Sequence, residues 1–196
     1  MNKTKRKIFE TSMKLFAEKG YDSTSIEEIT TEVGVAKGTL YYHFSSKEEI
    51  FEFLVKEGME LLKNSISVKT KQQKRYIDKI RAIVLIQIKI IIKYENFMSI
   101  VLREIWGRTP RSNICQKYVD EYIEIVKNLV KKGIEKGELI EADPEVLASE
   151  LFSLACGNLY YKKDNVIDIE KLYKEIDKTF IQFLKNSMGE RNEIKF

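Results

Sequence analysis

The chain has 196 residues, of which 43% are hydrophobic and 33% charged, with two prolines, nine glycines and a formal net charge of +4. This length and composition suit one or two compact helix-rich domains and exclude low-complexity and collagen-like chains. Cys115 and Cys156 lie far apart without a CxxC pair, and His43 is the single histidine. We therefore expect neither a disulfide scaffold nor a zinc site, and no metal or cofactor.

The N-terminus and the most apolar stretch both argue against export and membrane insertion. The start, MNKTKRKIFE, lacks the apolar core of a signal peptide. Residues 80–94 form the most apolar stretch, but Arg81, Lys89 and Lys93 interrupt it, so it is too short and too charged to span a bilayer. We expect a cytoplasmic protein without a membrane-spanning helix.

Two short helices about a glycine turn are predicted after a first helix over residues 3–19. Within Ser25–Val33, the apolar residues recur at helical spacing, and either Thr24 with Glu27 or Ser25 with Glu28 can form the capping box. Gly34 follows at the position that a helix-turn-helix commonly gives to glycine. The second helix is predicted over Ala36–Phe44, with its residues 40 and 44 facing inward.

The outward side chains of that second helix are suited to nucleic acid. They are one lysine, one hydroxyl, two phenols and an imidazole, without a carboxylate: Lys37, Thr39, Tyr41, Tyr42 and His43. Lysine, threonine and tyrosine are common phosphate partners, and the start of such a helix meets base edges in the major groove. Ser46 can cap the next helix with Glu49, and Lys47 at its start predicts a phosphate clamp.

Position, and not bulk charge, points to DNA. Residues 1–50 hold eight Lys/Arg and eight Asp/Glu, so the segment is neutral overall. The basic residues nevertheless form an N-terminal arm over residues 3–7, and Lys37 and Lys47 flank the second helix. A charged N-terminal arm is also common on helices that are simply solvated, so the arm alone favours neither interpretation.

The segment GVAKGTLYYHFSSKEEIF, with KIFETSMKLFAEKGYDSTSI before it, closely resembles the signature of TetR/AcrR-type transcriptional regulators. The resemblance covers roughly the first fifty residues. It implies an all-α fold, with a three-helix helix-turn-helix DNA-binding domain over residues 1–48 and a helical effector-binding and dimerisation domain over residues 49–196. It further implies DNA contacts at Ser25, Glu27, Ala36, Lys37, Gly38, Thr39, Tyr41, Tyr42, His43 and Lys47.

Two of these positions depart from the family pattern. Ala36 stands where a small hydroxyl residue is common, so a cap or contact is lost. Glu27 stands where some members carry a basic base-reading residue; it could accept a hydrogen bond from cytosine N4, or merely complete a capping box. The operator sequence therefore does not follow from the resemblance.

The rest of the chain predicts further helices. One runs from Ser46 to about residue 64. Residues 77–94 are rich in β-branched residues, which favours a strand. The run is nevertheless too long for one strand, and its apolar positions cover nearly the whole helical circumference, so we predict a central helix. Further helices are expected over residues 112–136, from Asp143-Pro144 to about residue 161, and from Asp168 through residue 184. Residues 189–196 should fray.

The last two helices could complete one monomer's core or pair with a second copy. In proteins resembling this one they pair with their symmetry mates as a four-helix bundle, so we expect a homodimer through these helices. Such proteins usually bind a small molecule within the second domain. The candidate lining consists of aromatic or soft side chains, with Arg103, Glu104 and Glu121 available as polar anchors. It comprises Phe97, Met98, Val101, Arg103, Glu104, Trp106, Tyr118, Tyr122, Phe152 and Tyr160. Each aromatic residue, taken singly, suits a core position equally well.

The expected function is that of a ligand-responsive regulator that binds double-stranded DNA at a palindromic operator. A small lipophilic effector would release it, as expected of a repressor, although activation is not distinguishable from sequence. The segment NFMSIVLREIWGRTPRSNI also resembles family members that respond to long acyl chains or acyl-CoA. No Ser/His/Asp or Cys/His arrangement or phosphate-binding glycine loop occurs, so no catalytic residues are expected. The alternative is an architectural or partner-recruiting DNA-binding protein without an effector.

Overall fold

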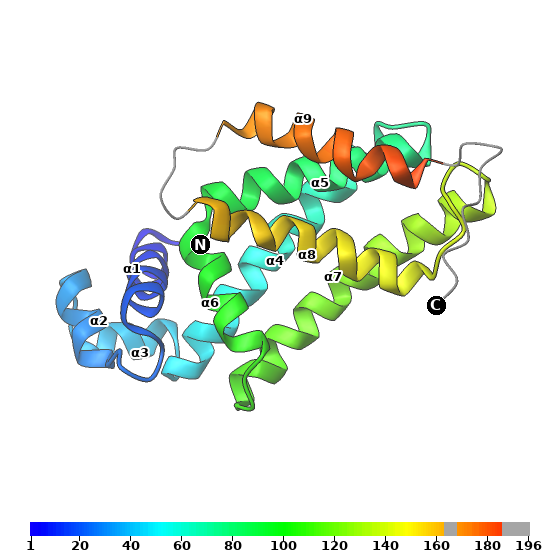
Figure 1. Ribbon diagram of the computed structural model, residues 1–196. Helices are drawn as coiled ribbons and strands as arrows, with labels where there is room; N and C mark the ends of the chain where they lie inside the picture. Colours follow the sequence, from blue (N-terminus) through cyan, green and yellow to red (C-terminus); the bar gives the residue numbers. More distant parts are fainter. Residues whose placement is uncertain (163–167, 186–196) are drawn as a thin grey trace. The chain divides into compact units, whose positions relative to one another are not determined.

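The computed structural model describes residues 1–162 and 168–185, and for residues 158–162 it describes the backbone alone. All regular elements in these ranges are helical, as expected (Figure 1). Outside the helices, Leu139 and Lys185 form an isolated antiparallel β-bridge. The elements are α1 (Lys3–Lys19), α2 (Ile26–Val33), α3 (Lys37–His43), α4 (Lys47–Lys71), α5 (Tyr76–Lys93), α6 (Glu95–Ile105), α7 (Pro110–Glu135), α8 (Pro144–Lys162), α9 (Ile169–Thr179) and the 3₁₀ turn η1 (Ile181–Leu184).

The chain divides into two compact units. Unit 1 comprises Met1–Leu61 and Lys93–Glu121, and unit 2 comprises Leu62–Ile92 and Tyr122–Phe196. Unit 1 therefore adds the first part of α4, α6 and the first part of α7 to the three N-terminal helices. The expected division of function at residues 48 and 49 stays a prediction. In the described ranges, no helix is long and apolar enough to cross a membrane.

Unit 1 is built on an aromatic core. Phe16 of α1, Tyr21 of the α1–α2 loop and Phe51 of α4 pack with ring centroids 5.2 to 6.3 Å apart. Helices α2 and α3 lie against α1, and α6 packs on the same helix (Figure 1). Burial of three large rings at one point removes several hundred square ångströms of apolar surface from water, on the order of 150–250 Å² per ring.

Local signals set the ends of the two short helices. Ser25 caps α2 by accepting a hydrogen bond from the amide of Glu28 at 3.0 Å. Gly34 ends α2 in the left-handed conformation, with φ of 76°, which costs any other residue more. In α3, Leu40 is fully buried, and Phe44 at the end of the helix is nearly so, which confirms the predicted inward face.

The apolar run of unit 2 is a helix, as predicted. Nine of its residues are buried on α5, whereas Lys89 and Lys93 are exposed, so the buried side chains cover one side of the helix rather than nearly its whole circumference, as was expected. The chain then breaks at Tyr94, which ends α5 and caps α6 without a side-chain hydrogen bond. The sequence carries neither glycine nor proline at this point, so the break was not predicted. On α5, the amide of the buried Gln87 donates to the hydroxyl of Tyr122, and its own carbonyl oxygen has no partner.

The C-terminal helices begin where predicted. Asp143 accepts hydrogen bonds from two amides at the start of α8, and Asp168 accepts from two at the start of α9. The last helix was expected to run through residue 184, but it ends at Thr179 and a 3₁₀ turn follows, so this prediction was too long. Arg81 of α5 bonds Asp177 of α9 at 2.7 Å, which joins two helices of unit 2. The predicted fraying of residues 189–196 falls outside the described residues.

Candidate nucleic-acid interface

The outer face of α3 is polar and open to solvent. Tyr42 is 84% exposed and Tyr41 is 45% exposed, whereas Thr39 and His43 are half-buried. A β-carbon added at Gly38 would meet nothing within 4 Å, so the backbone there can be approached closely. Ala36 caps α3 without a side-chain hydrogen bond, in keeping with the departure noted in the sequence. All expected DNA-contacting residues lie between Ser25 and Lys47, within unit 1.

Two of the expected contacts bind each other. Lys37, the first residue of α3, forms an ion pair with Glu27 in the first turn of α2. Both side chains are more than half exposed. The hydrogen bond from Lys37 lowers the pKa of Glu27, and the same bond raises the pKa of Lys37. The pair therefore joins the two helices of the helix-turn-helix at its surface.

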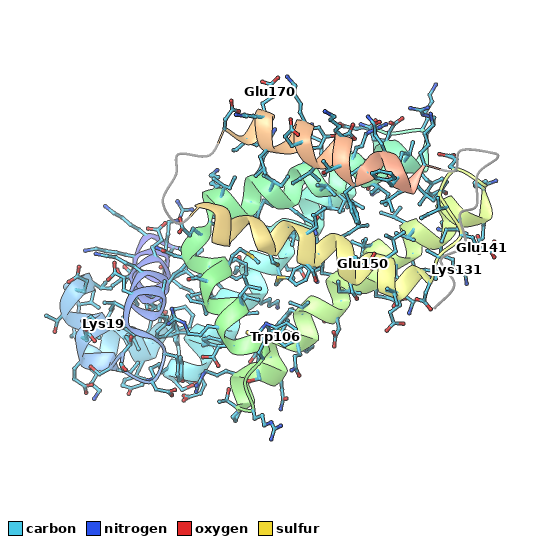
Figure 2. The ribbon with its side chains drawn as sticks, viewed as in Figure 1. Lys19, Trp106, Lys131, Glu141, Glu150 and Glu170 are labelled. Atoms are coloured by element: carbon cyan, nitrogen blue, oxygen red, sulfur yellow. The ribbon has the colours of Figure 1, made fainter. Side chains whose placement is uncertain are left out.

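The capping box of α2 uses Ser25 and Glu28. Glu28 is paired with Lys19 (labelled in Figure 2), which is the main cause of its lowered pKa, and the backbone of Ser25 adds a hydrogen bond to the same carboxylate. The hydroxyl of Thr24 instead donates to the carbonyl of Gly20 at 2.8 Å. Of the two capping boxes that the sequence allowed, Thr24 with Glu27 is therefore not the one that forms. Glu27 is left with Lys37 as its side-chain partner.

Lys47 lies at the start of α4 as expected, but its ammonium group serves the fold. It donates to the carbonyl oxygens of Tyr21 at 3.0 Å and Thr24 at 2.8 Å. The same nitrogen sits 4.2 Å from the centroid of the Tyr21 ring. Its role as a phosphate clamp stays a prediction, and in this structure it ties α4 to the α1–α2 loop.

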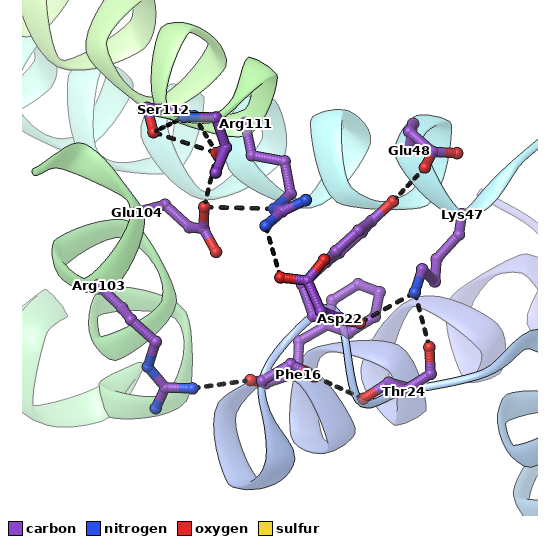
Figure 3. A network of polar contacts seen from close by, with 12 residues as sticks. Phe16, Asp22, Thr24, Lys47, Glu48, Arg103, Glu104, Arg111 and Ser112 are labelled. Carbon is purple, nitrogen blue, oxygen red and sulfur yellow. Dashed lines mark hydrogen bonds and ion pairs between the residues drawn. The ribbon is translucent and has the colours of Figure 1, made fainter. Parts of the chain in front are cut away.

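Tyr21 is the centre of a polar network that we call the Tyr21 hub: Tyr21, Asp22, Lys47, Glu48, Glu104 and Arg111 (Figure 3). The guanidinium of Arg111 also lies 4.2 Å from the centroid of the Tyr21 ring, so two cations contact this ring. The hydroxyl of Tyr21 donates to Glu48 at 2.6 Å. Burial, and then this hydrogen bond, raise the pKa of Tyr21 above its ordinary value.

Arg111 connects the hub to the turn between α6 and α7. It donates to Asp22 at 2.9 Å and to Glu104 at 3.2 Å, and its side chain is only 14% exposed. Nearby, Arg103 donates to the carbonyl oxygens of Phe16 and Ala17 in the last turn of α1 (Figure 3). A cation at this end of a helix is favoured by the helix dipole. The end of α1 and the following loop are thus fixed by side chains from α4, α6 and α7.

The N-terminal arm is partly used within the fold. The ammonium of Lys7 donates to the carbonyl of Val33, the last residue of α2, at 2.6 Å. That of Lys5 lies over the rings of Phe44 and Phe53, 4.7 and 4.5 Å from their centroids. Lys3, Arg6 and Lys7 are exposed, whereas Lys5 is half-buried, so most of the arm lies at the surface.

The expected effector-binding residues fall in both units. In unit 1, Phe97, Met98, Val101 and Tyr118 are buried. In unit 2, Tyr122 is fully buried and its ring lies 5.6 Å from that of Phe152. The side chain of Tyr160 lies outside the described residues. The structure does not report on a bound effector, so these assignments stay predictions.

Arg103, Glu104 and Trp106 differ from the buried aromatic members of that set. Arg103 and Glu104 were expected as polar anchors for a ligand, but their charged groups engage the end of α1 and Arg111. Trp106 follows α6 directly and is 86% exposed (Figure 2). It therefore belongs to the surface of unit 1 and not to its core.

Sequence reasoning missed the Tyr21 hub. The sequence predicted no role for residues 21, 22, 48 and 111. The bonds from Arg111 and Arg103 span 86 to 89 positions of the chain, so no local pattern signals them. Within the described residues, no group of three or more His, Cys, Asp or Glu is placed to hold a metal ion.

Two helices joined by a left-handed glycine turn, with the second exposed beyond a shared core, form a helix-turn-helix DNA-binding domain. Residues 8–54 match the family model described as "Bacterial regulatory proteins, tetR family". Residues 8–54 thus carry a DNA-binding domain of the TetR/AcrR type.

Individual relatives agree with this family. The negative transcriptional regulator IcaR of the biofilm operon icaADBC, from Staphylococcus aureus, is 40% identical over 74 residues, which are 38% of this chain and 40% of that protein. The match to a further curated relative covers 24% of its length, so the chain spans less than half of the curated relatives that it matches.

Solved structures cover nearly the whole chain. A putative fatty acid metabolism regulator from Clostridium perfringens has a TM-score of 0.86 and 29% identity, over 91% of this chain and 98% of that one. The regulator FadR from Bacillus subtilis, determined in complex with stearoyl-CoA, has a TM-score of 0.80 over 91% of this chain and 98% of that one. Its 20% identity supports the shared fold alone.

Proposed function

We propose that this chain is a ligand-responsive transcriptional regulator that binds a palindromic operator sequence-specifically and is released by a small lipophilic effector, as a repressor is. The observation that carries the proposal is the exposed face of α3, from Lys37 to His43, held on a buried helix-turn-helix core. The likeness to a negative regulator and to a fatty acid metabolism regulator supports both parts. A protein of this kind acts where the chromosome is, in the cytoplasm.

The DNA-binding surface of the proposal comprises the ten residues named from the sequence. Tyr42, with 84% of its surface exposed, is the side chain best able to reach a phosphate or a base. The proposed dimer forms through α8 and α9 and presents two copies of α3 to successive major grooves, ~34–36 Å apart. A two-fold symmetric protein then requires an operator with matching palindromic symmetry.

The proposed effector is an amphiphile with a long apolar part, such as a fatty acid or acyl-CoA. The stearoyl-CoA in the FadR structure and the name of the Clostridium regulator support this class. Release would be a shift in population, since an effector acts only through a difference in affinity between the DNA-competent and the other arrangement. The Tyr21 hub and the neighbouring Arg103 offer a route, because Arg103 and Arg111 tie α6 and α7 to the end of α1 and the loop that follows it.

The test is selection of bound sequences from a random pool of double-stranded DNA, followed by affinity measurements with a panel of fatty acids, acyl-CoAs and bile acids. A short enriched palindrome that is lost on adding one ligand class is the expected result. Enrichment without any response to the panel would contradict the effector. Broad coverage without an enriched sequence would instead favour an architectural DNA-binding protein.

A further inference from the structure

The balance of charge on the DNA-facing surface raises a question of how this protein avoids DNA of arbitrary sequence. Among the ten expected contacts, Glu27 is the single carboxylate, and Lys37 and Lys47 are the two lysines. Lys47 is held by two backbone carbonyls. Lys37 therefore supplies the accessible ammonium of this set, and it is paired with Glu27.

The structural contributions of Glu27 are small: it lies in the first turn of α2, where the helix dipole favours a carboxylate, and it pairs with Lys37 at the surface. The capping box of α2 is made by Ser25 and Glu28, so Glu27 is not the residue that completes it. The pair with Lys37 is exposed on both sides, and such pairs add little to stability. A negative charge on a surface that meets phosphates opposes binding, so its presence has a cost to affinity.

We propose, building on the proposed function, that Glu27 is a specificity-determining residue that masks Lys37 until the correct base edge is met. On DNA of arbitrary sequence, phosphates compete with Glu27 for Lys37, and the carboxylate is left facing negative charge. At the operator, an amino group in the major groove, cytosine N4 or adenine N6, donates to Glu27 and frees Lys37 for a phosphate. Affinity and sequence are thereby coupled through one pair of side chains.

The test compares Glu27→Gln with Glu28→Gln. Both changes remove one negative charge from the first turn of α2, and glutamine can still complete the capping box at residue 28. The measurements are the affinities for the selected operator and for a scrambled duplex of equal length, from 50 to 200 mM salt. An unmasked Lys37 neutralises about one more phosphate, which steepens the dependence of log affinity on log salt by about 0.9.

The expected result is specific to Glu27. Relative to the unmodified protein, the gain of Glu27→Gln on scrambled DNA should be about 3.5-fold larger at 50 mM than at 200 mM salt, from a fourfold salt ratio raised to the power of 0.9. The ratio of operator to scrambled affinity should fall, and selection with this variant should lose preference at one position of each half-site. Glu28→Gln should change neither the slope nor the ratio.

The Lys37→Met variant distinguishes masking of Lys37 by Glu27 from a general repulsion between Glu27 and the DNA phosphates. In Lys37→Met, the further change of Glu27 to Gln should no longer steepen the salt dependence. Equal effects of the residue 27 and residue 28 variants, or a residue 27 effect that persists without Lys37, would overturn the inference. If the unmodified protein selects no sequence at all, the proposed function fails instead, so the two failures are distinguishable.

Discussion

The outer face of α3 and the Tyr21 hub use the same residue types for opposite purposes. Tyr42 and Lys37 on the face are exposed, and their polar groups are directed to solvent or to one surface partner. Tyr21 and Lys47 in the hub are buried or half-buried, and each satisfies several groups of the fold. A tyrosine or lysine near a recognition helix is therefore a candidate contact only when its environment leaves the polar end available.

The largest effect is expected from Tyr21→Ala. It removes a buried ring that stacks with two cations and hydrogen-bonds Glu48, so the free energy of unfolding should fall by about 3–5 kcal/mol. Tyr42→Ala is the matched control, and it should leave stability within about 0.5 kcal/mol while weakening operator binding. Urea unfolding and operator titration measure both. Equal losses of stability would contradict the division between face and hub.

Arg111→Met should have the next largest effect. It leaves Glu104, which is 12% exposed, without its cation, and the free energy of unfolding should fall by about 2–3 kcal/mol. Operator affinity should drop through misplacement of the α1–α2 loop, with an unchanged salt dependence because Arg111 faces the protein and not DNA. The exposed Arg108 supplies the control variant, Arg108→Met. A shallower salt dependence in Arg111→Met would make that side chain a phosphate contact.

Lys47→Met and Lys37→Met sharpen the comparison further. The first change deletes two hydrogen bonds from an ammonium to carbonyls, and unfolding should become easier by about 1.5 kcal/mol, the lower end of the range for a charged donor. The second should leave the unfolding midpoint unchanged, because its pair is exposed. Thermal melts of both variants and of the unmodified protein measure this difference in stability. Should Lys47→Met melt like the unmodified protein and lose operator affinity, the phosphate-clamp prediction would be favoured.

The smallest effect is expected from Trp106→Ala. The side chain is 86% exposed, so stability should change by no more than about 0.5 kcal/mol, and operator affinity without effector should be retained. The prediction from sequence is that this variant alters the response to the effector. Titration with the acyl-CoA panel in the presence of operator measures that response. A parallel loss of operator binding would make Trp106 part of the DNA-binding framework.

Sequence predicted the parts of this fold that depend on neighbours along the chain. The ends of α1, α2 and α8 follow from Gly20, Gly34 and Asp143-Pro144, and the inward face of α3 follows from its spacing. The start of α6 at Tyr94 could not be predicted, because no breaking residue marks it. Which of two capping boxes forms on α2 also depended on where Thr24 points.

The site was predictable in outline only. Residue type and spacing located the exposed face of α3, but they could not show that Lys47 meets the carbonyls of Tyr21 and Thr24, 26 and 23 positions earlier. Nor could they show that Arg103 reaches α1. Such bonds depend on how separate helices pack, and a single sequence without an alignment carries no pairwise signal for them.

The shortness of α3 has a consequence for how the domain folds. Seven residues without a side-chain cap are far below the length at which a helix persists alone in water, about 12–15 residues. The backbone hydrogen bonds of α3 therefore exist only while Leu40 and Phe44 are packed in unit 1. Its amide protons should consequently exchange no more slowly than those of α1.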